Sequence, residues 1–475
     1  MTNQKLTALM LAGALALGLC GGAVLAADPV EPDTFAVEEQ EAQPEVQADT
    51  SASQAETAQE PSAEDNSEET GDTQEPQEPA QPDPDPEGTL SFANVDSRVR
   101  SGDYNCLVLG ETIAQVEATD YEKLQEELRE GLNDIANAQW QLHTMGGAIQ
   151  LPDGPGMDEL EQALQGMVSM STSSASQTLQ AQYDALREQF DDLKEGKIQK
   201  EAADTVRQLK STQDGLVLLA QSMYVQLSEL QATDASLQRA LDALDRQIEE
   251  LELRYELGQI SSLTLQQAKA GRTSLVSQKQ TLESSAATLT MNLQSMVGAP
   301  LTGSMRLSAL PQVTDQQLAA MDLEADLAAA KEASYTLYAA KKTLDDAEET
   351  YKDAGKEYNY NENKYQFVQA QHAWQAAQYT YDGAVQSFEL SFRTLYAQVK
   401  DYQQVLQAAQ TALAVEQDNY AVDQLKYEQG TISENTLLTA KDDLDTAQDT
   451  VNTAQRNLFS AYNNYRWAVD YGILN

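Results

Sequence analysis

Side chains that could carry out chemistry are few and widely spaced in this sequence. Its 475 residues include two cysteines, Cys20 and Cys106, and two histidines, His143 and His372, which offer neither a disulfide framework nor a zinc-ligand cluster. We find no nucleophile beside a base, no phosphate-binding loop and no carboxylate pair at a catalytic spacing. The sequence therefore predicts a protein that is not an enzyme and has no cofactor or metal site.

The residues that stand out form a motif that occurs twice. "YELGQISSLTLQQAK" begins at Tyr255 and "YEQGTISENTLLTAK" begins at Tyr427, 172 positions later, and nine of the fifteen positions are identical. Upstream, "YVQL" at Tyr224 aligns with "YAQV" at Tyr396 at the same offset. Internal repeats indicate duplicated structural units. The duplicated unit is therefore at least residues 224–296 and 396–468.

Each copy of the motif has the features of one helix ending and the next beginning. A glycine, Gly258 or Gly430, suits the left-handed residue that closes a helix. A serine three residues later, Ser261 or Ser433, suits the N-cap of the next helix. An isoleucine before the serine and a leucine after it have the spacing of a hydrophobic staple. These staple pairs are Ile260 with Leu265 and Ile432 with Leu437. The motif thus predicts the tight turn of a helical hairpin, built twice.

The elements that hold these turns are predicted to be long helices. No proline occurs between residues 157 and 299 or between 312 and 475, and both stretches are rich in strong helix formers. After each turn, apolar residues recur at alternating spacings of three and four, the pattern of a coiled-coil seam. The first seam is Leu265, Ala268, Arg272, Leu275, Lys279, Leu282, Ala286, Leu289, Leu293 and Met296, of which eight are apolar and Arg272 and Lys279 interrupt the pattern. The second is Leu437, Ala440, Leu444, Ala447, Val451, Ala454, Leu458, Ala461, Tyr465 and Ala468, and all ten are apolar if Tyr is counted.

The predicted fold class is therefore all-α, with long antiparallel coiled-coil hairpins in two structural repeats. Glycine- and proline-rich or polar stretches predict loops at 146–156, 297–317 and 352–363. Tyr255 and Tyr427 are interpreted as seam residues that close the coiled coil. The tryptophans are interpreted as packing anchors rather than as a ligand site; they are Trp140, Trp374 and Trp467.

The N-terminal part has a different character. Residues 1–26 have the pattern of a signal peptide, with a retained membrane anchor as the alternative. Residues 28–87 hold nine of the thirteen prolines and twenty acidic residues without Lys or Arg, which predicts a disordered linker over 27–89. A first repeat at 90–298, an inter-repeat linker at 299–317 and a second repeat at 318–475 follow. The net charge of −46 argues against nucleic acid as a partner.

This pattern resembles the TolC-like outer-membrane efflux proteins. Their two repeats each contain a hairpin turn of the form Tyr-x-x-Gly-x-x-[Ser/Thr], which is present here at Tyr255, Gly258 and Ser261 and again 172 residues later. The segment "MVGAPLTG" is similar to the family's Leu-Leu-Gly-x-Pro segment between repeats, and the C-terminal "AYNNYRWAVDYGILN" is similar to its last helix. The resemblance covers most of residues 90–475.

The resemblance implies a homotrimer that forms a helical conduit in an efflux or secretion system. It also implies that the hairpin tips dock onto a membrane-fusion adaptor, which works with an inner-membrane pump. The implied contact residues are those of the two turns: Tyr255, Gly258, Ile260, Ser261, Tyr427, Gly430, Ile432 and Ser433. That step is an analogy of fold.

The sequence departs from the family pattern in two respects. Neither repeat contains a stretch that reads as a pair of membrane-spanning strands, so we expect little or no β-barrel. With the acidic linker, this favours a Gram-positive-type cell surface within an exported, extracytoplasmic location. In addition, Thr264 and Thr436 stand where the family often has Asp, and whether Glu434, Asp442 or Asp443 replaces it is left open.

Two functions remain at this stage. The first is a conduit that works with an adaptor and a pump, favoured by the twofold preservation of the tip turn. The second is a coiled-coil spacer or surface scaffold without a channel, favoured by the missing strands.

Overall fold

The computed structural model describes residues 85–86, 88–145 and 157–474, which belong to one compact unit, Asp83–Asn475. The predicted signal peptide and the predicted loop at 146–156 lie outside the described residues. The same holds for the predicted linker, except for its last residues. Among these, Thr89 already pairs with Arg306, so the folded unit begins slightly before the predicted first repeat.

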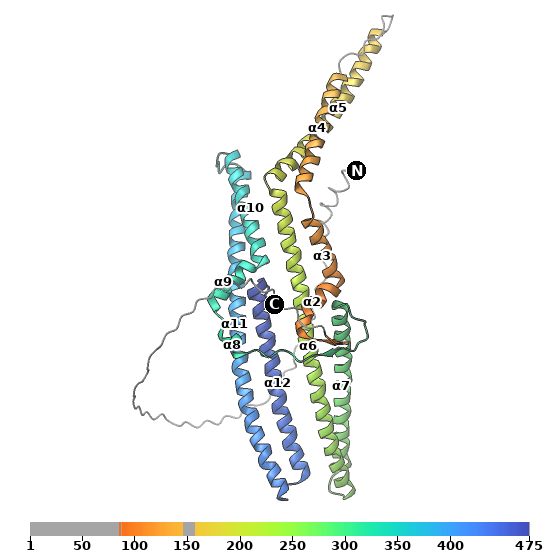
Figure 1. The fold of residues 1–475 in the computed structure, drawn as a ribbon, viewed down its shortest axis with the longest axis vertical. Helices are drawn as coiled ribbons and strands as arrows, with labels where there is room; N and C mark the ends of the chain where they lie inside the picture. Colours follow the sequence, from red (N-terminus) through yellow and green to blue (C-terminus); the bar gives the residue numbers. More distant parts are fainter. Residues whose placement is uncertain (1–84, 87, 146–156, 475) are drawn as a thin grey trace, which may run out of the picture. The chain divides into compact units, whose positions relative to one another are not determined.

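Helices account for nearly all of the described secondary structure, which confirms the all-α prediction (Figure 1). They are α2 (Phe92–Gly102), α3 (Tyr104–Glu117), α4 (Tyr121–Met145), α5 (Met157–Lys194), α6 (Lys197–Glu256), α7 (Ser262–Met296), α8 (Asp315–Ala319), α9 (Leu323–Ala333), α10 (Tyr335–Glu357), α11 (Tyr365–Glu428) and α12 (Glu434–Tyr471). Two short strands, β1 (Thr89–Leu90) and β2 (Arg306–Leu307), pair in parallel. In the described part of the chain, no helix is both long enough and apolar enough to span a membrane.

The duplication seen in the sequence reappears in the helix boundaries. α6 ends at Glu256 and α11 at Glu428, which are 428 − 256 = 172 positions apart. α7 begins at Ser262 and α12 at Glu434, again 172 apart. The two hairpins, α6/α7 and α11/α12, are therefore built from equivalent residues.

These two hairpins lie side by side in one layer. α12 packs against both α11 and α6, and α6 packs against α7, so that α11 and α7 form the two edges of the layer (Figure 1). The predicted seams lie where the helices of each hairpin meet. Every residue of the second seam is buried or half-buried, and Arg272 is the one exposed residue of the first. The predicted seam positions are thus covered in both hairpins, apart from Arg272.

The core lies where the hairpins join the shorter helices. In one cluster the fully buried Tyr224 donates its hydroxyl hydrogen to the carbonyl oxygens of Leu90 and Ser308, at 3.1 and 2.7 Å. In a second cluster, the hydroxyl of Tyr465 on α12 donates to a carboxylate oxygen of Asp326 on α9. Buried polar groups need such partners, so these bonds tie the strands and α9 to the long helices.

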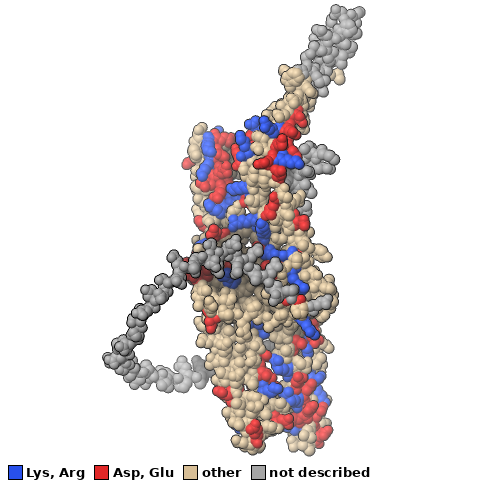
Figure 2. Space-filling model, viewed as in Figure 1, with Lys and Arg blue, Asp and Glu red and all other residues tan. Residues whose placement is uncertain are grey.

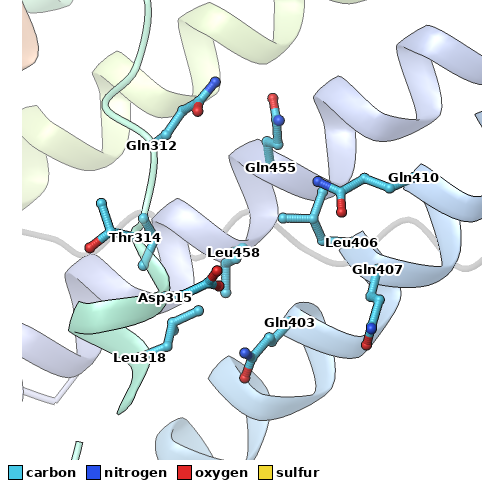
Figure 3. A pocket seen from close by; sticks show the side chains of 11 residues that line it. Gln312, Thr314, Asp315, Leu318, Gln403, Leu406, Gln407, Gln410, Gln455 and Leu458 are labelled. Atoms are coloured by element: carbon cyan, nitrogen blue, oxygen red, sulfur yellow. The ribbon is translucent and has the colours of Figure 1, made fainter. Parts of the chain in front are cut away.

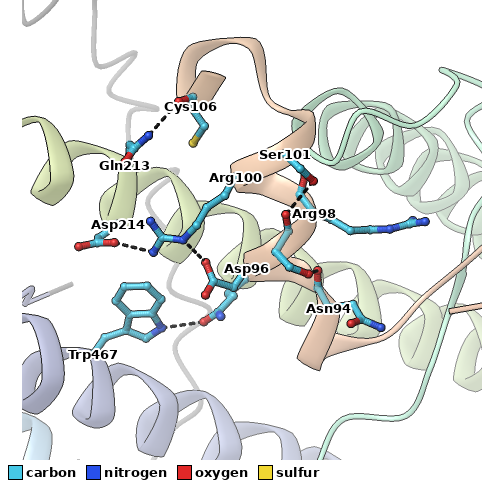
Figure 4. Close-up of polar contacts among 11 residues, drawn as sticks. Asn94, Asp96, Arg98, Arg100, Ser101, Cys106, Gln213, Asp214 and Trp467 are labelled. Atoms are coloured by element: carbon cyan, nitrogen blue, oxygen red, sulfur yellow. Dashed lines mark hydrogen bonds and ion pairs between the residues drawn. The ribbon is translucent and has the colours of Figure 1, made fainter. Parts of the chain in front are cut away.

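A polar network joins α2, α6 and α12 next to the first cluster (Figure 4). Arg100 on α2 forms ion pairs of 2.6 Å with Asp96 and with Asp214 of α6. On α12, the indole N–H of Trp467 donates to the Gln221 side-chain oxygen of α6 at 2.7 Å. Trp467 is 6% exposed, as expected for a packing anchor. This network fixes the two repeats to each other.

Two sequence-based expectations are wrong in detail. α10 continues to Glu357, so the predicted loop at 352–363 is reduced to a turn around the positive-φ residues Asn359 and Tyr360. The helix persists because its apolar stripe still has α11 to pack against, and Tyr351 stacks on Trp374 there. Trp140, interpreted as an anchor, is 68% exposed.

Candidate functional site

The two hairpin turns have the same backbone geometry. Gly258 and Gly430 both have φ of 71°, the left-handed conformation in which a side chain would be strained. At the first turn, the N–H of Gly258 donates to the carbonyl of Tyr255 (2.9 Å), and that of Gln259 donates to Arg254 (2.8 Å). The second turn repeats both bonds, at 2.8 and 2.9 Å. This is a Schellman motif, and it confirms the predicted helix stop.

The predicted helix starts are confirmed as well. Ser261 is the N-cap of α7, and its hydroxyl oxygen accepts the backbone N–H of Thr264 at 3.2 Å. Ser433 caps α12 in the same way through Thr436, also at 3.2 Å. Ile260 and Ile432, the first residues of the two predicted staples, are half-buried. The turn motif thus encodes its own local structure, whatever it binds.

Tyr255 and Tyr427 correct a sequence-based interpretation. They are 45% and 39% exposed and do not close the seams. The neighbouring Leu253 and Leu425, which are also 172 residues apart, are 58% and 56% exposed. Both tips therefore expose a Leu-x-Tyr pair to solvent. The pair occurs in both copies of the repeat, but the seam spacing predicted that its tyrosines would be covered.

Charged and polar contacts link the two hairpins near their tips. Arg246 of α6 forms an ion pair with Asp442 of α12, and the Asn435 amide of α12 donates to Glu250 of α6 at 3.3 Å. Asp442 is thus engaged within the chain, which answers part of the question left open by the sequence. Asp443, in contrast, is exposed.

The α6/α7 hairpin is also crossed by ion pairs along its seam. Lys279 contacts Asp234 at 2.5 Å, and Lys269 contacts Glu252 at 2.7 Å. Arg272 contacts Asp245, and its hydrogen bond holds the pKa of the Asp245 carboxyl below its ordinary value of 3.8. The Asp245 carboxylate therefore stays ionised at neutral pH and pairs with Arg272 across the two helices.

A hollow of about 580 Å³, which the sequence did not indicate, lies between residues 312–318 and the α11/α12 hairpin (Figure 3). Its polar lining consists mostly of glutamine amides, with leucine side chains between them. The glutamines are Gln312, Gln403, Gln407, Gln410 and Gln455. Neutral amides can hydrogen-bond but do not act as nucleophiles, bases or strong metal ligands. Asp315 is the one carboxylate in this lining.

Groups that could do chemistry stay apart in the described part of the chain. Three or more His, Cys, Asp or Glu side chains nowhere gather there as metal ligands. Cys106 is buried, and burial raises the pKa of its thiol to about 11. It is therefore protonated and unreactive at neutral pH. The hairpin tips remain the candidate functional site.

Comparison with known proteins places the fold. No family model and no curated protein matches the sequence. Among solved structures, the outer-membrane channel OprN matches with a TM-score of 0.51 and 13% identity, over 80% of this chain and 90% of that chain. CusC matches at a TM-score of 0.44 and 15% identity, over 80% and 96% of the two chains. CmeC of Campylobacter jejuni, an outer membrane channel, matches at 0.40 and 12%, over 61% and 68%.

At this identity, the likeness to OprN is a likeness of fold. It agrees with the duplicated hairpins and with their helical layer, which the structure shows independently. The described part of this chain therefore has a TolC-like fold, which it shares with the outer-membrane channel OprN.

Proposed function

We propose that this protein is an exported component of an efflux or secretion system. In this proposal, three copies form a helical conduit, and the hairpin tips dock onto a membrane-fusion adaptor that works with an inner-membrane pump. The location is the extracytoplasmic envelope, with residues 27–89 as a linker at a Gram-positive-type cell surface. The fold supports a channel role, and the remaining parts are our extension of it.

The observation that carries docking is the exposure of the same apolar pair at both tips. Leu253 and Tyr255 at one tip and Leu425 and Tyr427 at the other remain about half exposed. At the first tip, Leu257 and Leu263 add further apolar surface, at 64% and 62% exposure. Clustered apolar side chains on a soluble surface mark interaction sites, because burying them is favourable. Apolar side chains at the end of a helical hairpin fit a partner that offers a matching apolar helical surface.

The assembly is tested first by the mass of the protein in solution. Light scattering on a sizing column, over a range of concentrations, is expected to give three times the mass of one chain. Negative-stain images of that species should show a stain-filled centre when viewed along the axis. A monomer at every concentration would refute the conduit and favour the spacer or scaffold.

Docking is tested separately with photoreactive residues in the producing cell. Placed at Leu253 and at Leu425, they are expected to cross-link a membrane-anchored protein with a long helical hairpin, identified by mass spectrometry. Leu301 is the matched control, because it is 64% exposed but lies away from the tips. Equal cross-linking at all three positions, or none at the tips, would contradict docking through the tips.

A further inference from the structure

The hollow between residues 312–318 and the α11/α12 hairpin is lined for hydrogen bonding with almost no charge (Figure 3). Five of its eleven lining residues are glutamines, and Asp315 is the one ionisable residue among them. In the described part of the chain, none of these five side-chain amides has a hydrogen-bond partner. Each amide carries two donor hydrogens and one acceptor oxygen. The hollow therefore offers unused donors and acceptors to a molecule that enters it.

The five amides come together from three separate segments. Glutamine is a good helix former, so a single exposed glutamine on a helix is ordinary. Here Gln403, Gln407 and Gln410 share one face of α11, because their spacings are four and three residues. Gln455 comes from α12, and Gln312 comes from the segment before α8 (Figure 3). Convergence on one hollow distinguishes these glutamines from others on the helix surfaces.

The wall of the hollow formed by residues 312–318 is fixed by its own contacts. Thr314 and Gln317 form a capping box at the start of α8. Leu318 is 3% exposed, and the Nζ of Lys400 on α11 donates to its carbonyl oxygen at 2.9 Å. A wall held in this way is formed before a ligand binds, which lowers the entropic cost of binding.

The duplication of the hairpins does not by itself require these amides. The residues 172 positions before the α11 and α12 glutamines are Gln231, Ala235, Gln238 and Glu283. The Gln238 amide donates to Asp242 at 2.9 Å, and Glu283 forms an ion pair with Lys279 at 2.8 Å. The first repeat thus has an alanine or an engaged side chain at three of the four positions. The set of free amides belongs to the second repeat.

The lining favours a neutral ligand that is rich in hydroxyl groups. A hydroxyl both donates and accepts, so it pairs with a glutamine amide in either orientation. Between the amides, Leu406 and Leu458 offer apolar contacts to the C–H groups of a sugar ring. No Lys or Arg lines the hollow, so an anionic ligand would find no partner there. The volume of about 580 Å³ lies within the range of small-molecule sites, ~300–1,000 Å³.

A peptide fits this lining less well than a sugar. Charged side chains of a peptide would find only Asp315, and large apolar side chains would need a continuous apolar surface, which the amides interrupt. A sugar chain has no such side chains, and its polar groups are distributed all around each ring. The amides of the hollow, which approach from three segments, match that distribution.

We propose that the hollow binds a short neutral oligosaccharide that lies along α11. At ~1.5 Å per residue, Gln403, Gln407 and Gln410 are separated by ~6 and ~4.5 Å along the helix axis, close to the length that each ring adds to an extended sugar chain. Successive rings then meet successive glutamines of α11, and Gln455 and Gln312 bond from the other two segments. This goes beyond the proposed function, because the site lies within one chain and needs neither a ring of copies nor an adaptor.

Titration calorimetry of the full chain with two neutral probes gives the first test. The probes are tetra-N-acetylchitotetraose and cellotetraose, which differ in their N-acetyl groups. Binding of the first alone would assign the site to an amino-sugar glycan, and binding of both, or of cellotetraose alone, to neutral polysaccharides that are read through hydroxyl groups. Binding of neither sugar would overturn the proposal. Tighter binding of a capped tetraglycine peptide than of both sugars would also overturn it.

A pair of double variants tests which residues bind the sugar. Gln403→Leu with Gln410→Leu removes two amides of α11 but keeps side-chain size and helix propensity. It should weaken sugar binding by about tenfold or more, because sugar hydroxyls lose their partners. Gln231→Leu with Gln238→Leu is the matched control, since it changes the equivalent residues of α6 outside the hollow. Unchanged affinity in the first variant, or equal weakening in both, would overturn the proposal.

Hydrogen exchange of the wild-type chain locates the site without any substitution. Saturating sugar should slow the exchange of residues 312–318, which form one wall of the hollow, and leave the turn at 258–261 unchanged. This measurement stays decisive if the leucine variants fold poorly. Slower exchange elsewhere in the chain, with no change at 312–318, would place the sugar in another site and overturn the proposal.

Discussion

The two hairpins have equivalent backbones but hold their helices together by different chemistry. In α6/α7, Lys279 pairs with Asp234 across the seam, and its side chain is only 19% exposed. In α11/α12, the residues 172 positions later are Val451 and Leu406, which lie in an apolar cluster. In the described chain, three ion pairs join α6 to α7 and none joins α11 to α12. On the face shown in Figure 2, charges are accordingly denser over α6/α7 than over α11/α12.

This difference shows that the seam spacing specifies a helical hairpin but not whether charged or apolar side chains occupy the seam. A lysine and an aspartate of suitable length occupy the same two positions as a valine and a leucine. Burial of apolar surface stabilises directly, whereas a partly exposed ion pair contributes little after its desolvation cost. We therefore expect α11/α12 to depend on packing, and α6/α7 to tolerate loss of its ion pairs.

The largest effect should come from placing a charge in the apolar seam. Val451→Asp buries an unpaired carboxylate at a position that is 4% exposed and should cost about 3 kcal/mol of unfolding free energy. Urea unfolding followed by circular dichroism measures the loss. The neighbouring exposed Thr450 provides the control, Thr450→Asp, which should change stability little. Equal losses in both variants would show that the seam is not what holds α12.

A smaller effect is expected at the turns, where the hairpins are alike. Gly258→Ala and Gly430→Ala should each cost about 1 kcal/mol, because alanine is strained at a φ of 71°. Gly271→Ala, inside α7 with open space around its Cα, should instead stabilise by about 0.5–1 kcal/mol. Urea midpoints compare the three variants. A loss confined to one turn would break the equivalence of the two tips.

The ion pair of α6/α7 can be converted into the pair found in α11/α12. Lys279→Val alone leaves Asp234 without its partner and should cost about 0.5–1 kcal/mol, since Asp234 remains 38% exposed. Lys279→Val with Asp234→Leu should recover this loss or exceed wild-type stability. A double-mutant cycle measured by urea unfolding gives the coupling between the two positions. A double variant less stable than the single one would mean that the charges serve a role beyond this hairpin.

The smallest effect concerns pH. Because Arg272 lowers the pKa of Asp245 in the folded chain, the contribution of this pair is fully present above pH 3.8 and is lost as the pH falls through the lower folded value. Hydrogen exchange of α6 and α7 should therefore accelerate below that pH, relative to that of α11 and α12. In Asp245→Asn, hydrogen exchange of α6 and α7 near residue 245 should no longer accelerate relative to that of α11 and α12. If the acceleration persists, groups other than Asp245 cause it.

Much of the fold could be predicted because its signals are local. The Gly and Ser of each turn act on neighbouring backbone groups, so the two Schellman motifs and the N-caps at Ser261 and Ser433 followed from residue type and spacing. The seams followed from periodicity, which depends only on helix geometry. The α10 end was missed, because packing against α11 extends a helix into a polar segment that is unfavourable by itself.

The exposure of the tips was missed for a related reason. Tyr255 continues the seam spacing, but spacing does not say whether a seam position close to the end of a hairpin is covered. The same limit applies to Arg272 and Lys279, which looked like interruptions of the seam and are in fact paired across it with Asp245 and Asp234. The proposed contact of the tips with an adaptor stays a prediction.

By itself, the sequence determined the helices, their duplication at 172 residues, the two turns and the faces on which helices meet, because each depends on interactions between residues close along the chain. Only the tertiary structure decided which helices lie side by side, which charges are paired, and that α7 and α11 are the edges left open. Those features depend on contacts between residues about 200 positions apart, such as Arg239 with Asp449, which no local pattern encodes.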